Sequence, residues 1–290
     1  MIFRYDLSIA GVSVRIETDR ELKKNAEFAP FFAETEYPDV RVSFQKANAL
    51  PGVPEKVLYT DQCAKIALDD QGNFRKFFYE NNKDPVCYAS ATYDRRGGSV
   101  QVVYLEEYKR CVSEVQNCFF HIGFDAVLLQ KNRLCLHAAC VDTSLGGILF
   151  SGVSGIGKST QANLWCKYRG AKQINGDRPI LSKENGGWTA WGSPYAGSSN
   201  VHVNDSCDIA AIVLLKQAER CAIRKLSTAE AFRGVWAGLT VRTWDAAFVE
   251  RASELTIELA TGLPVYEFCC TPDEEAVRFL EEELRKDNNK

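Results

Sequence analysis

Residues 152–160 read GVSGIGKST and combine glycines, a lysine and hydroxyl side chains at the spacing of a phosphate-binding loop. The pattern G-x-x-x-x-G-K-[ST] is satisfied by Gly152, Gly157, Lys158 and Ser159. Such glycines let backbone N–H groups point at phosphate oxygens, the lysine neutralises phosphate charge, and the hydroxyl joins the Mg²⁺ shell. The segment predicts a nucleotide phosphate site formed by Gly152, Val153, Ser154, Gly155, Ile156, Gly157, Lys158, Ser159 and Thr160.

The residues on either side supply the strand and the helix that such a loop requires. A short apolar run, GILFS at 147–151, comes directly before the loop, and residues 159–168 favour a helix after it. The N-terminus of that helix would add partial positive charge next to a bound phosphate. The alternative is a glycine-rich turn that happens to carry a lysine, and it does not account for this order of elements.

Transfer of a phosphoryl group also needs a metal ligand and a group that orients or deprotonates the acceptor. Asp177 is the acidic candidate, because one helix and a return strand at 172–175 can bring it beside the phosphate loop. There the carboxylate could bind Mg²⁺ together with Ser159, or accept the proton of the acceptor hydroxyl. In the alternative interpretation, Asp177 only caps the turn before Pro179.

Three further features stay open between a functional and a structural role. His137 lies in the strand expected to pair with the one entering the loop, where it is either catalytic or a hydrogen-bonded core residue. Arg178 can supply charge to the transition state or form a surface salt bridge. Residues 192–200 (GSPYAGSSN) are small and polar, and form an acceptor-side or nucleotide-side loop or an ordinary connection. The catalytic candidates are therefore Asp177, His137 and Lys158.

The composition argues against several classes of function. The 290 residues carry 35 basic and 38 acidic side chains, a net charge of −3, without a strongly basic block, which argues against a nucleic-acid partner. No apolar stretch approaches the roughly 18 residues of a membrane span, and no secretory pattern opens the sequence. The 11 cysteines are irregularly spaced and accompany only 3 histidines, which favours reduced thiols over a zinc site. We therefore expect a cytoplasmic protein with no membrane partner.

The chain is expected to have two parts, a β-rich region at 1–110 and an α/β domain at 111–290. The β-rich region carries no metal-ligand spacing or nucleophile pattern, so only a structural or substrate-recognition role is predicted for it. Alternating apolar residues there predict a hairpin at 2–17, strands at 39–44 and 99–105, and a turn at 95–98.

The second part is expected to begin with a helix over 112–130, because its apolar residues recur at three- and four-residue steps. His121 lies away from that stripe and is expected at the surface or partly buried. The apolar run at 209–215 suits a strand buried on both faces. Further strands are predicted at 134–141, 148–151, 172–175, 180–181, 188–191, 221–226 and 264–270.

Three helices are predicted to close the chain. The first begins with a capping box of Ser227 and Glu230, the second spans about 244–262 with Asp245 as first-turn charge, and the last spans 271–285 with Thr271 as N-cap. Four tryptophans are expected in core or interface positions rather than stacked on a base: Trp188, Trp191, Trp236 and Trp244.

Residues 134–182, which include LHAACVD, GGILFSGVSGIGKST and NGDRPIL, resemble the catalytic domain of HPr kinase/phosphorylase and its relatives. The resemblance implies the P-loop-containing fold that this domain shares with phosphoenolpyruvate carboxykinase, here preceded by a β-rich region. It also implies that His137 contacts the transferred phosphate and that Asp177 is the second member of an acidic pair. Gly176 stands at the first acidic position, so one carboxylate must act both as metal ligand and as proton acceptor, or another residue must help.

The resemblance further implies a kinase that uses ATP or GTP with Mg²⁺ and phosphorylates a serine-type hydroxyl. No counterpart of the segment that contacts HPr is evident, so the expected acceptor is a peptide, another protein or a small metabolite. Family members assemble into oligomers, which implies a homo-oligomer here. Two alternatives stay open: a nucleotide-binding regulatory or accessory module without turnover, prompted by Gly176, and a carboxykinase-like or phosphorylase-like phosphoryl transfer.

Overall fold

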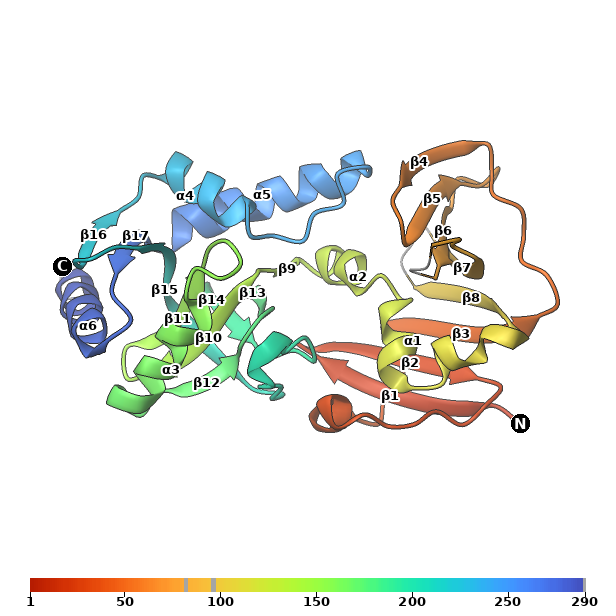
Figure 1. Cartoon of the computed structure of the whole chain (residues 1–290), viewed down its shortest axis with the longest axis horizontal. Coiled ribbons are helices and arrows are strands. Elements are labelled where there is room, and N and C mark those ends of the chain that lie inside the picture. The colour runs from red at the N-terminus through yellow and green to blue at the C-terminus, as the bar shows by residue number, and fades with distance from the viewer. Residues whose placement is uncertain (81–82, 95–97, 289–290) are drawn as a thin grey trace. The chain divides into compact units, whose positions relative to one another are not determined.

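A computed structural model of the chain describes residues 1–80, 83–94 and 98–288. The chain divides into two compact units, Met1–Gln130 (unit 1) and Lys131–Lys290 (unit 2), and each is described by itself (Figure 1). The boundary expected at 110/111 falls inside unit 1. The helical segment after it belongs to unit 1 because its side chains pack there, for example Phe119, whose ring centroid is 5.2 Å from that of Phe28.

Unit 1 is built on one eight-stranded sheet with the order β1-β2-β3-β8-β7-β6-β5-β4. Neighbouring strands are antiparallel except for β2 with β3 and β3 with β8, which are parallel. The strands are β1 (Phe3–Ile9), β2 (Val12–Thr18), β3 (Val40–Ala47), β4 (Lys56–Thr60), β5 (Ala64–Leu68), β6 (Phe74–Tyr79), β7 (Cys87–Tyr93) and β8 (Ser99–Leu105). A 3-10 helix, η1 (Ala26–Phe31), lies between β2 and β3 in the chain.

The strands predicted for the β-rich region are confirmed. β1 and β2 form the predicted hairpin, and its two-residue turn, Ala10 and Gly11, adopts φ of +51° and +71° as tight hairpin turns require. The predicted strands at 39–44 and 99–105 are β3 and β8. Of the turn predicted at 95–98, residues 95–97 lie outside the described residues.

The continuous helix predicted over 112–130 is wrong. The segment forms a 3-10 helix, η2 (Glu106–Val112), and two short helices, α1 (Val115–Phe120) and α2 (Phe124–Gln130). Gly123 interrupts the helical path with a φ of +66°, a conformation that glycine adopts without steric cost. Each short helix buries most of its apolar side chains, among them Phe119 of α1 and Leu128 of α2, which explains the helical spacing in the sequence.

His121 is buried rather than at the surface, with an exposed fraction of 4%. It lies at the C-terminal end of α1 among aromatic rings, 4.4 Å from Phe78 and 6.0 Å from Phe44 between ring centroids. Its Nδ1 is 2.7 Å from the carbonyl oxygen of Asn117, so Nδ1 carries the hydrogen, and Nε2 is 3.3 Å from the hydroxyl of Tyr88. Burial lowers the pKa of His121 to about 4, so the ring is neutral near pH 7.

Unit 2 contains a nine-stranded mixed sheet with the order β12-β10-β11-β15-β14-β13-β9, in which β17 also lies beside β15 and β16 beside β17. Together with the helices of both units, this makes an α+β fold. The strands are β9 (Arg133–Cys135), β10 (Ala138–Thr143), β11 (Gly146–Ser151), β12 (Lys172–Asn175), β13 (Ile180–Glu184), β14 (Gly187–Trp191), β15 (Ser206–Gln217), β16 (Ala222–Lys225) and β17 (Val265–Cys270).

The long strand β15 pairs with three other strands of this sheet. It contains the apolar run at 209–215, for which the sequence predicts a strand. Its first residues pair with β14 in antiparallel fashion, and its second half lies between β11 and β17 in parallel pairing. The predicted hairpin of β13 and β14 and the predicted strands β11, β12, β16 and β17 are also confirmed. The single strand predicted at 134–141 is instead two strands, β9 and β10.

Helices cover both faces of the unit 2 sheet (Figure 1). On one face, α3 (Lys158–Arg169) and α6 (Glu274–Asn288) bury Trp165 and Leu280 in one cluster with strand residues such as Phe150 and Phe268. On the other face lie α4 (Thr228–Trp236) and α5 (Ala246–Gly262). Gly234 of α4 approaches the side chain of Leu214 so closely that a Cβ would lie 2.1 Å from its Cδ1.

The predicted helix starts are confirmed in one case and shifted in two. The Ser227–Glu230 capping box opens α4 as predicted. Asp245 is the N-cap of α5 rather than a first-turn charge, because its Oδ1 accepts the N–H of Phe248 at 3.2 Å. Thr271 is not the N-cap of α6. A residue before a proline disfavours helical geometry, and Asp273 instead accepts the N–H of Ala276 at 3.3 Å.

No helix in the described part of the chain has both the length and the apolar character that crossing a bilayer requires.

Candidate phosphate-binding site

The phosphate loop connects the end of β11 to the start of α3, as the sequence predicts. Gly152, Gly155 and Gly157 adopt φ of +144°, +79° and +113°, backbone conformations that residues with a Cβ rarely adopt. At Gly152 a Cβ would also lie 3.2 Å from Ile156 and 3.5 Å from the carbonyl oxygen of Leu215. The glycines of the motif are therefore required by this loop conformation itself.

Lys158 is the first residue of α3, and its side chain folds back over the loop. Its Nζ donates to the carbonyl oxygens of Gly152 and Val153, both at 3.1 Å. These two bonds use two of the three N–H donors of the ammonium. Only 8% of the residue is exposed. Burial lowers the pKa of Lys158, and the charge of Asp177 opposes that effect. The loop thus holds the Lys158 ammonium in place at the start of α3.

The N-terminus of α3 adds backbone donors at the same place. The first four N–H groups of a helix have no carbonyl partner within it, and the helix dipole places partial positive charge there. Ser159 and Thr160 lie in this first turn, so their backbone N–H groups and hydroxyls border the loop. This combination of loop, lysine and helix terminus suits an anion with several oxygens, such as the phosphate chain of a nucleotide.

His137 lies in a break between two strands rather than in the middle of one. The chain leaves β9 after Cys135 and enters β10 at Ala138. The N–H of His137 donates to the carbonyl oxygen of Gly238 at 2.8 Å, and the N–H of Ala138 donates to that of Asp177 at 3.0 Å. The break therefore brings His137 next to the turn that carries Asp177.

The imidazole of His137 faces the carboxylate of Asp177. Nδ1 of His137 lies 3.1 Å from Oδ1 of Asp177, yet among the described residues this buried Nδ1 has no well-aligned hydrogen bond. The pKa of His137 is lowered chiefly by burial and next by the charge of Lys158, while the charge of Asp177 acts in the opposite direction. A lowered pKa means a neutral imidazole near pH 7.

These residues line one pocket of about 300 Å³. The phosphate loop and its helix form one side, and the His137–Asp177 pair with Gly176 forms another part of the lining. The lining residues are His137, Ser154, Gly155, Gly157, Lys158, Ser159, Thr160, Gly176 and Asp177. Of the predicted loop residues, Gly152 is packed against Leu215, Val153 is 71% exposed, and Ile156 packs on the core of unit 2.

The pocket fits a metal ion that is bound jointly with phosphates. The Ser159 hydroxyl and the Asp177 carboxylate are oxygen ligands of the kind that Mg²⁺ uses, and both line the pocket. The described residues contain no group of three or more histidine, cysteine, aspartate and glutamate side chains arranged to hold a metal by themselves. A Mg²⁺ ion here would therefore take its remaining ligands from nucleotide and water, as is common for this ion.

Arg178 lies beside the pocket and forms a partly exposed ion pair. Its Nε is 3.7 Å from Oδ2 of Asp177, and its Nη1 donates to the Thr240 hydroxyl at 2.7 Å. The segment of Gly238 and Thr240, after α4, was not anticipated as a neighbour of the site. In the sequence, a glycine after a helix indicates only the end of that helix. In the structure, Gly238 is also packed closely, because a Cβ there would lie 3.0 Å from Leu136 and 3.1 Å from Ser151.

The loop at 192–200 lies against the turn that carries Asp177. A Cβ at Gly176 would lie 1.8 Å from Oγ of Ser199, and a Cβ at Gly197 would lie 2.8 Å from Cβ of Asp177. This loop is therefore part of the surroundings of the site rather than a remote connection. The space for a longer side chain at position 176 is filled by Ser199, which accounts for the glycine there.

The cysteines and the four tryptophans lie outside the pocket lining. None of the 11 cysteines forms a disulfide in the part of the chain that the structure describes. Trp188 is 3% exposed, and the Trp236 ring stacks on Phe232 with centroids 5.6 Å apart, which agrees with a packing role.

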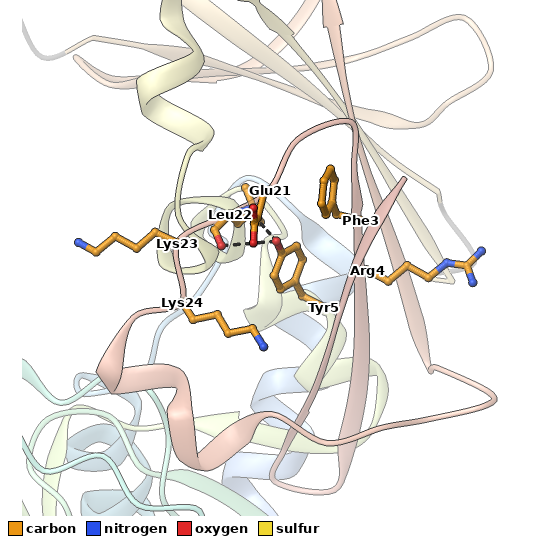
Figure 2. Close-up of a pocket in the computed structure, with 7 residues that line it drawn as sticks. All are labelled: Phe3, Arg4, Tyr5, Glu21, Leu22, Lys23 and Lys24. Carbon is orange, nitrogen blue, oxygen red and sulfur yellow. Dashed lines mark hydrogen bonds between the residues drawn. The ribbon is translucent and has the colours of Figure 1, made fainter. Parts of the chain in front are cut away.

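Unit 1 contains a second pocket, of about 630 Å³, between the start of β1 and the segment at 21–24 (Figure 2). The Tyr5 hydroxyl closes one end by hydrogen bonds with the backbone N–H and carbonyl of Leu22. Arg4 and Lys23 extend away from it on opposite sides and pair with Glu17 and Glu114. The third bordering cation, Lys24, lies over the ring of Phe32, 4.9 Å from its centroid. No predicted site residue lines this pocket.

Comparison with solved structures finds distant neighbours. No family model matches the chain, and no curated protein matches it either. Among solved structures, the chain is similar to the HPr(Ser) kinase/phosphatase from Coxiella burnetii, with 15% sequence identity and a TM-score of 0.33. The match covers 53% of this chain and 94% of that one. A TM-score below 0.5 does not establish a shared fold.

Proposed function

We propose that the protein is a kinase that transfers the γ-phosphoryl group of ATP, with Mg²⁺, to a serine-type hydroxyl. The observation that supports this most directly is that the phosphate loop and the His137–Asp177 pair line the same pocket. A loop with a buried lysine suffices to bind a nucleotide. A carboxylate and an imidazole beside the phosphate position are what transfer to an acceptor requires in addition.

The proposed roles follow from position in the pocket. Lys158 and the amides at the start of α3 hold the β- and γ-phosphates. Ser159 and Asp177 would hold Mg²⁺, which would draw charge from the phosphates. The acceptor oxygen forms a bond to the γ-phosphorus while the bond from that phosphorus to the β–γ bridging oxygen breaks. The acceptor proton goes to the Asp177 carboxylate, and ADP leaves with the bridging oxygen.

His137 is proposed to orient the transferred group. A neutral imidazole has one N–H donor and one lone pair, so it can donate a hydrogen bond to a phosphoryl oxygen and accept one from a protonated group. Its Nδ1 lies 3.1 Å from Oδ1 of Asp177, which supports a joint role of both groups at one phosphoryl group. The acceptor is proposed to be a peptide, another protein or a small hydroxylated molecule.

A second candidate is a nucleotide-binding module without turnover. The observation that favours it is that Ser199 fills the side-chain space at Gly176, so Asp177 is the one carboxylate among the residues that line the described pocket. A single carboxylate must then both bind metal and accept a proton. A module of this kind would bind nucleotide tightly and release no ADP.

Release of ADP in the presence of acceptor pools separates the two candidates. Wild-type protein and Lys158→Ala are incubated with Mg-ATP or Mg-GTP and with free serine and other hydroxylated metabolites, with serine- and threonine-containing peptides, or with HPr. The kinase proposal predicts ADP release by wild type in one pool, with the added phosphate located by mass spectrometry. Nucleotide binding without ADP release in every pool would favour the binding module instead.

A further inference from the structure

Asn175, at the end of β12, connects the turn of Asp177 to the loop at 192–200. The residue is fully buried. Its Oδ1 accepts the N–H groups of Asp177 and Arg178 at 2.9 and 2.7 Å, and its Nδ2 lies 3.1 and 3.3 Å from the carbonyl oxygen and Oγ of Ser193. An amide side chain has two donors and two acceptor lone pairs. Both ends of the Asn175 amide are thus engaged within the protein.

Ser193 supplies the complementary half of this connection. It is also fully buried, and its Oγ donates to the carbonyl oxygen of Arg178 at 2.7 Å and accepts the N–H of Tyr195 at 3.2 Å. Buried polar groups are costly to leave unpaired, so loss of either side chain leaves several backbone groups without a partner. The turn and the loop are thereby joined through both N–H and carbonyl groups.

The two segments also interlock sterically. Gly176 leaves room for Ser199, and Gly197 leaves room for Asp177, whose Cβ and Cγ would lie 2.8 and 2.9 Å from a Cβ at position 197. The loop therefore packs against Cβ and Cγ of Asp177. On another side, Nδ1 of His137 lies 3.1 Å from Oδ1 of the Asp177 carboxylate. Its orientation is fixed from two directions.

We infer that Asn175 and Ser193 are positioning residues, which hold the Asp177 carboxylate against His137 through the loop at 192–200. This inference rests on the proposed function for its catalytic consequence. Neither side chain lines the pocket, so neither contacts nucleotide there. Nucleotide affinity depends chiefly on the phosphate loop, to which neither side chain is hydrogen-bonded in the described part of the chain. Transfer depends in addition on the exact placement of Asp177.

Ser182 offers a matched control within the same unit. It is 1% exposed, its Oγ lies 2.9 Å from Glu184 Oε1, and it accepts the Nε1–H of Trp191 at 2.8 Å. It thus resembles Ser193 in burial and in bonding, but its partners lie on β13 and β14. Ser182→Ala and Ser193→Ala should cost similar stability, and only the second should affect transfer.

The kinetic test compares Asn175→Ala, Ser193→Ala and Ser182→Ala in the full chain. We expect kcat to fall roughly 10- to 100-fold in the first two, the range known for supporting residues of active sites, with the dissociation constant of Mg-ATP changed less than about threefold. Ser182→Ala should keep kcat within about twofold. Equal kcat values in Ser193→Ala and Ser182→Ala would overturn the inference, and this pair stays decisive if Asn175→Ala does not fold.

Amide hydrogen exchange tests the network without turnover. The N–H groups of Asp177 and Arg178 bond to Asn175, so Asn175→Ala should speed their exchange at least about tenfold relative to Ser182→Ala. Unchanged exchange at both amides would also overturn the inference. If wild type transfers no phosphate to any acceptor while these amides respond, the proposed function fails and the positioning network stands.

Discussion

Lys158 is the residue on which nucleotide binding should depend most strongly. Its ammonium is held at the loop by two carbonyl oxygens, and hydrogen bonds that involve a charged group are worth about 1.5–3 kcal/mol. Lys158→Ala should therefore weaken Mg-ATP binding roughly 10- to 100-fold, as calorimetry would measure. Lys167→Ala on the same helix is the control, because that amine contacts Tyr168 instead. Equal affinities in the two variants would contradict the role given to Lys158.

Asp177 should affect transfer much more strongly than nucleotide binding. Asp177→Asn keeps the shape of the side chain but removes the charge that can ligate Mg²⁺ and accept a proton. We expect kcat to fall about 10²- to 10⁴-fold, the range for loss of a general base, with the unfolding transition near that of wild type. Near-normal kcat in Asp177→Asn would show that another group accepts the proton.

At the scale of single residues, part of the site could be predicted from the sequence. The fixed spacing of the phosphate loop predicts Lys158 and Ser159 directly, because their roles follow from local geometry. The proximity of His137 and Asp177 was expected from a family resemblance and is produced by the strand break before Ala138, which no local pattern marks. Asn175 was visible only as a member of the NGDRP segment. Its role depends on Ser193, which is distant in sequence.

At the level of elements, the turn of Asp177 and the loop at 192–200 should be energetically coupled. Gly176→Ala places a Cβ 1.8 Å from Oγ and 2.2 Å from Cβ of Ser199, so it should destabilise unit 2 by about 1–3 kcal/mol. The double variant Gly176→Ala/Ser199→Gly lacks the Ser199 side chain and should recover much of the stability that Gly176→Ala loses. A double-mutant cycle measures this coupling. Additive effects of the two substitutions would contradict the interlock.

The control for that cycle is Gly187→Ala, whose nearest neighbour would be 3.9 Å away. Unfolding can be followed by tryptophan fluorescence, because all 5 tryptophans of the sequence lie in unit 2. Gly187→Ala should leave the transition almost unchanged.

Elements were predicted well where side chains alternate or where a run is continuously apolar, as in β1, β2 and β15. The prediction over 112–130 failed although its apolar spacing is helical, because the same spacing fits two short helices that each bury apolar side chains. The single glycine at 123 decides between them, since it takes a positive φ that ends the helical path. Burial of His121 depends on rings from β3, β6 and β7, which contact it only after the sheet has formed.

At the level of the whole molecule, unit 1 should lose stability as the pH falls. His121 is neutral in the folded protein, with a pKa of about 4 against an ordinary value of 6.5. The unfolded chain therefore binds a proton at a pH where the folded chain does not. The contribution of His121 to the free energy of unfolding of unit 1 should be fully present above about pH 6.5. It should decrease by about 3 kcal/mol as the pH falls to 4.

Hydrogen exchange of amides in β3 and β7 between pH 7 and pH 4.5 would measure this effect. In His121→Phe, which cannot titrate, most of that pH dependence should disappear from unit 1, while the tryptophan-reported transition of unit 2 should stay as in wild type. An undiminished pH dependence of β3 and β7 in His121→Phe would assign the effect to other groups.

The division of the chain into units could be predicted only approximately from the sequence. Composition and strand spacing separate a β-rich region from an α/β domain, yet the segment at 115–130 looks like the start of the second part. Its assignment to unit 1 depends on contacts such as Phe119 with Phe28 and with Phe124, which are long-range or depend on the turn at Gly123. Such contacts are a property of the folded unit and have no local pattern.

The most direct test of the central claim is transfer of radiolabelled γ-phosphate from Mg-ATP to an acceptor. Wild type, Lys158→Ala and Asp177→Asn would be compared at nucleotide concentrations that saturate each variant. The account predicts acceptor-dependent label on a serine-type hydroxyl with wild type, and a loss of label in Asp177→Asn despite bound nucleotide. Equal labelling by wild type and Asp177→Asn, or saturated wild type that labels no acceptor, would contradict it.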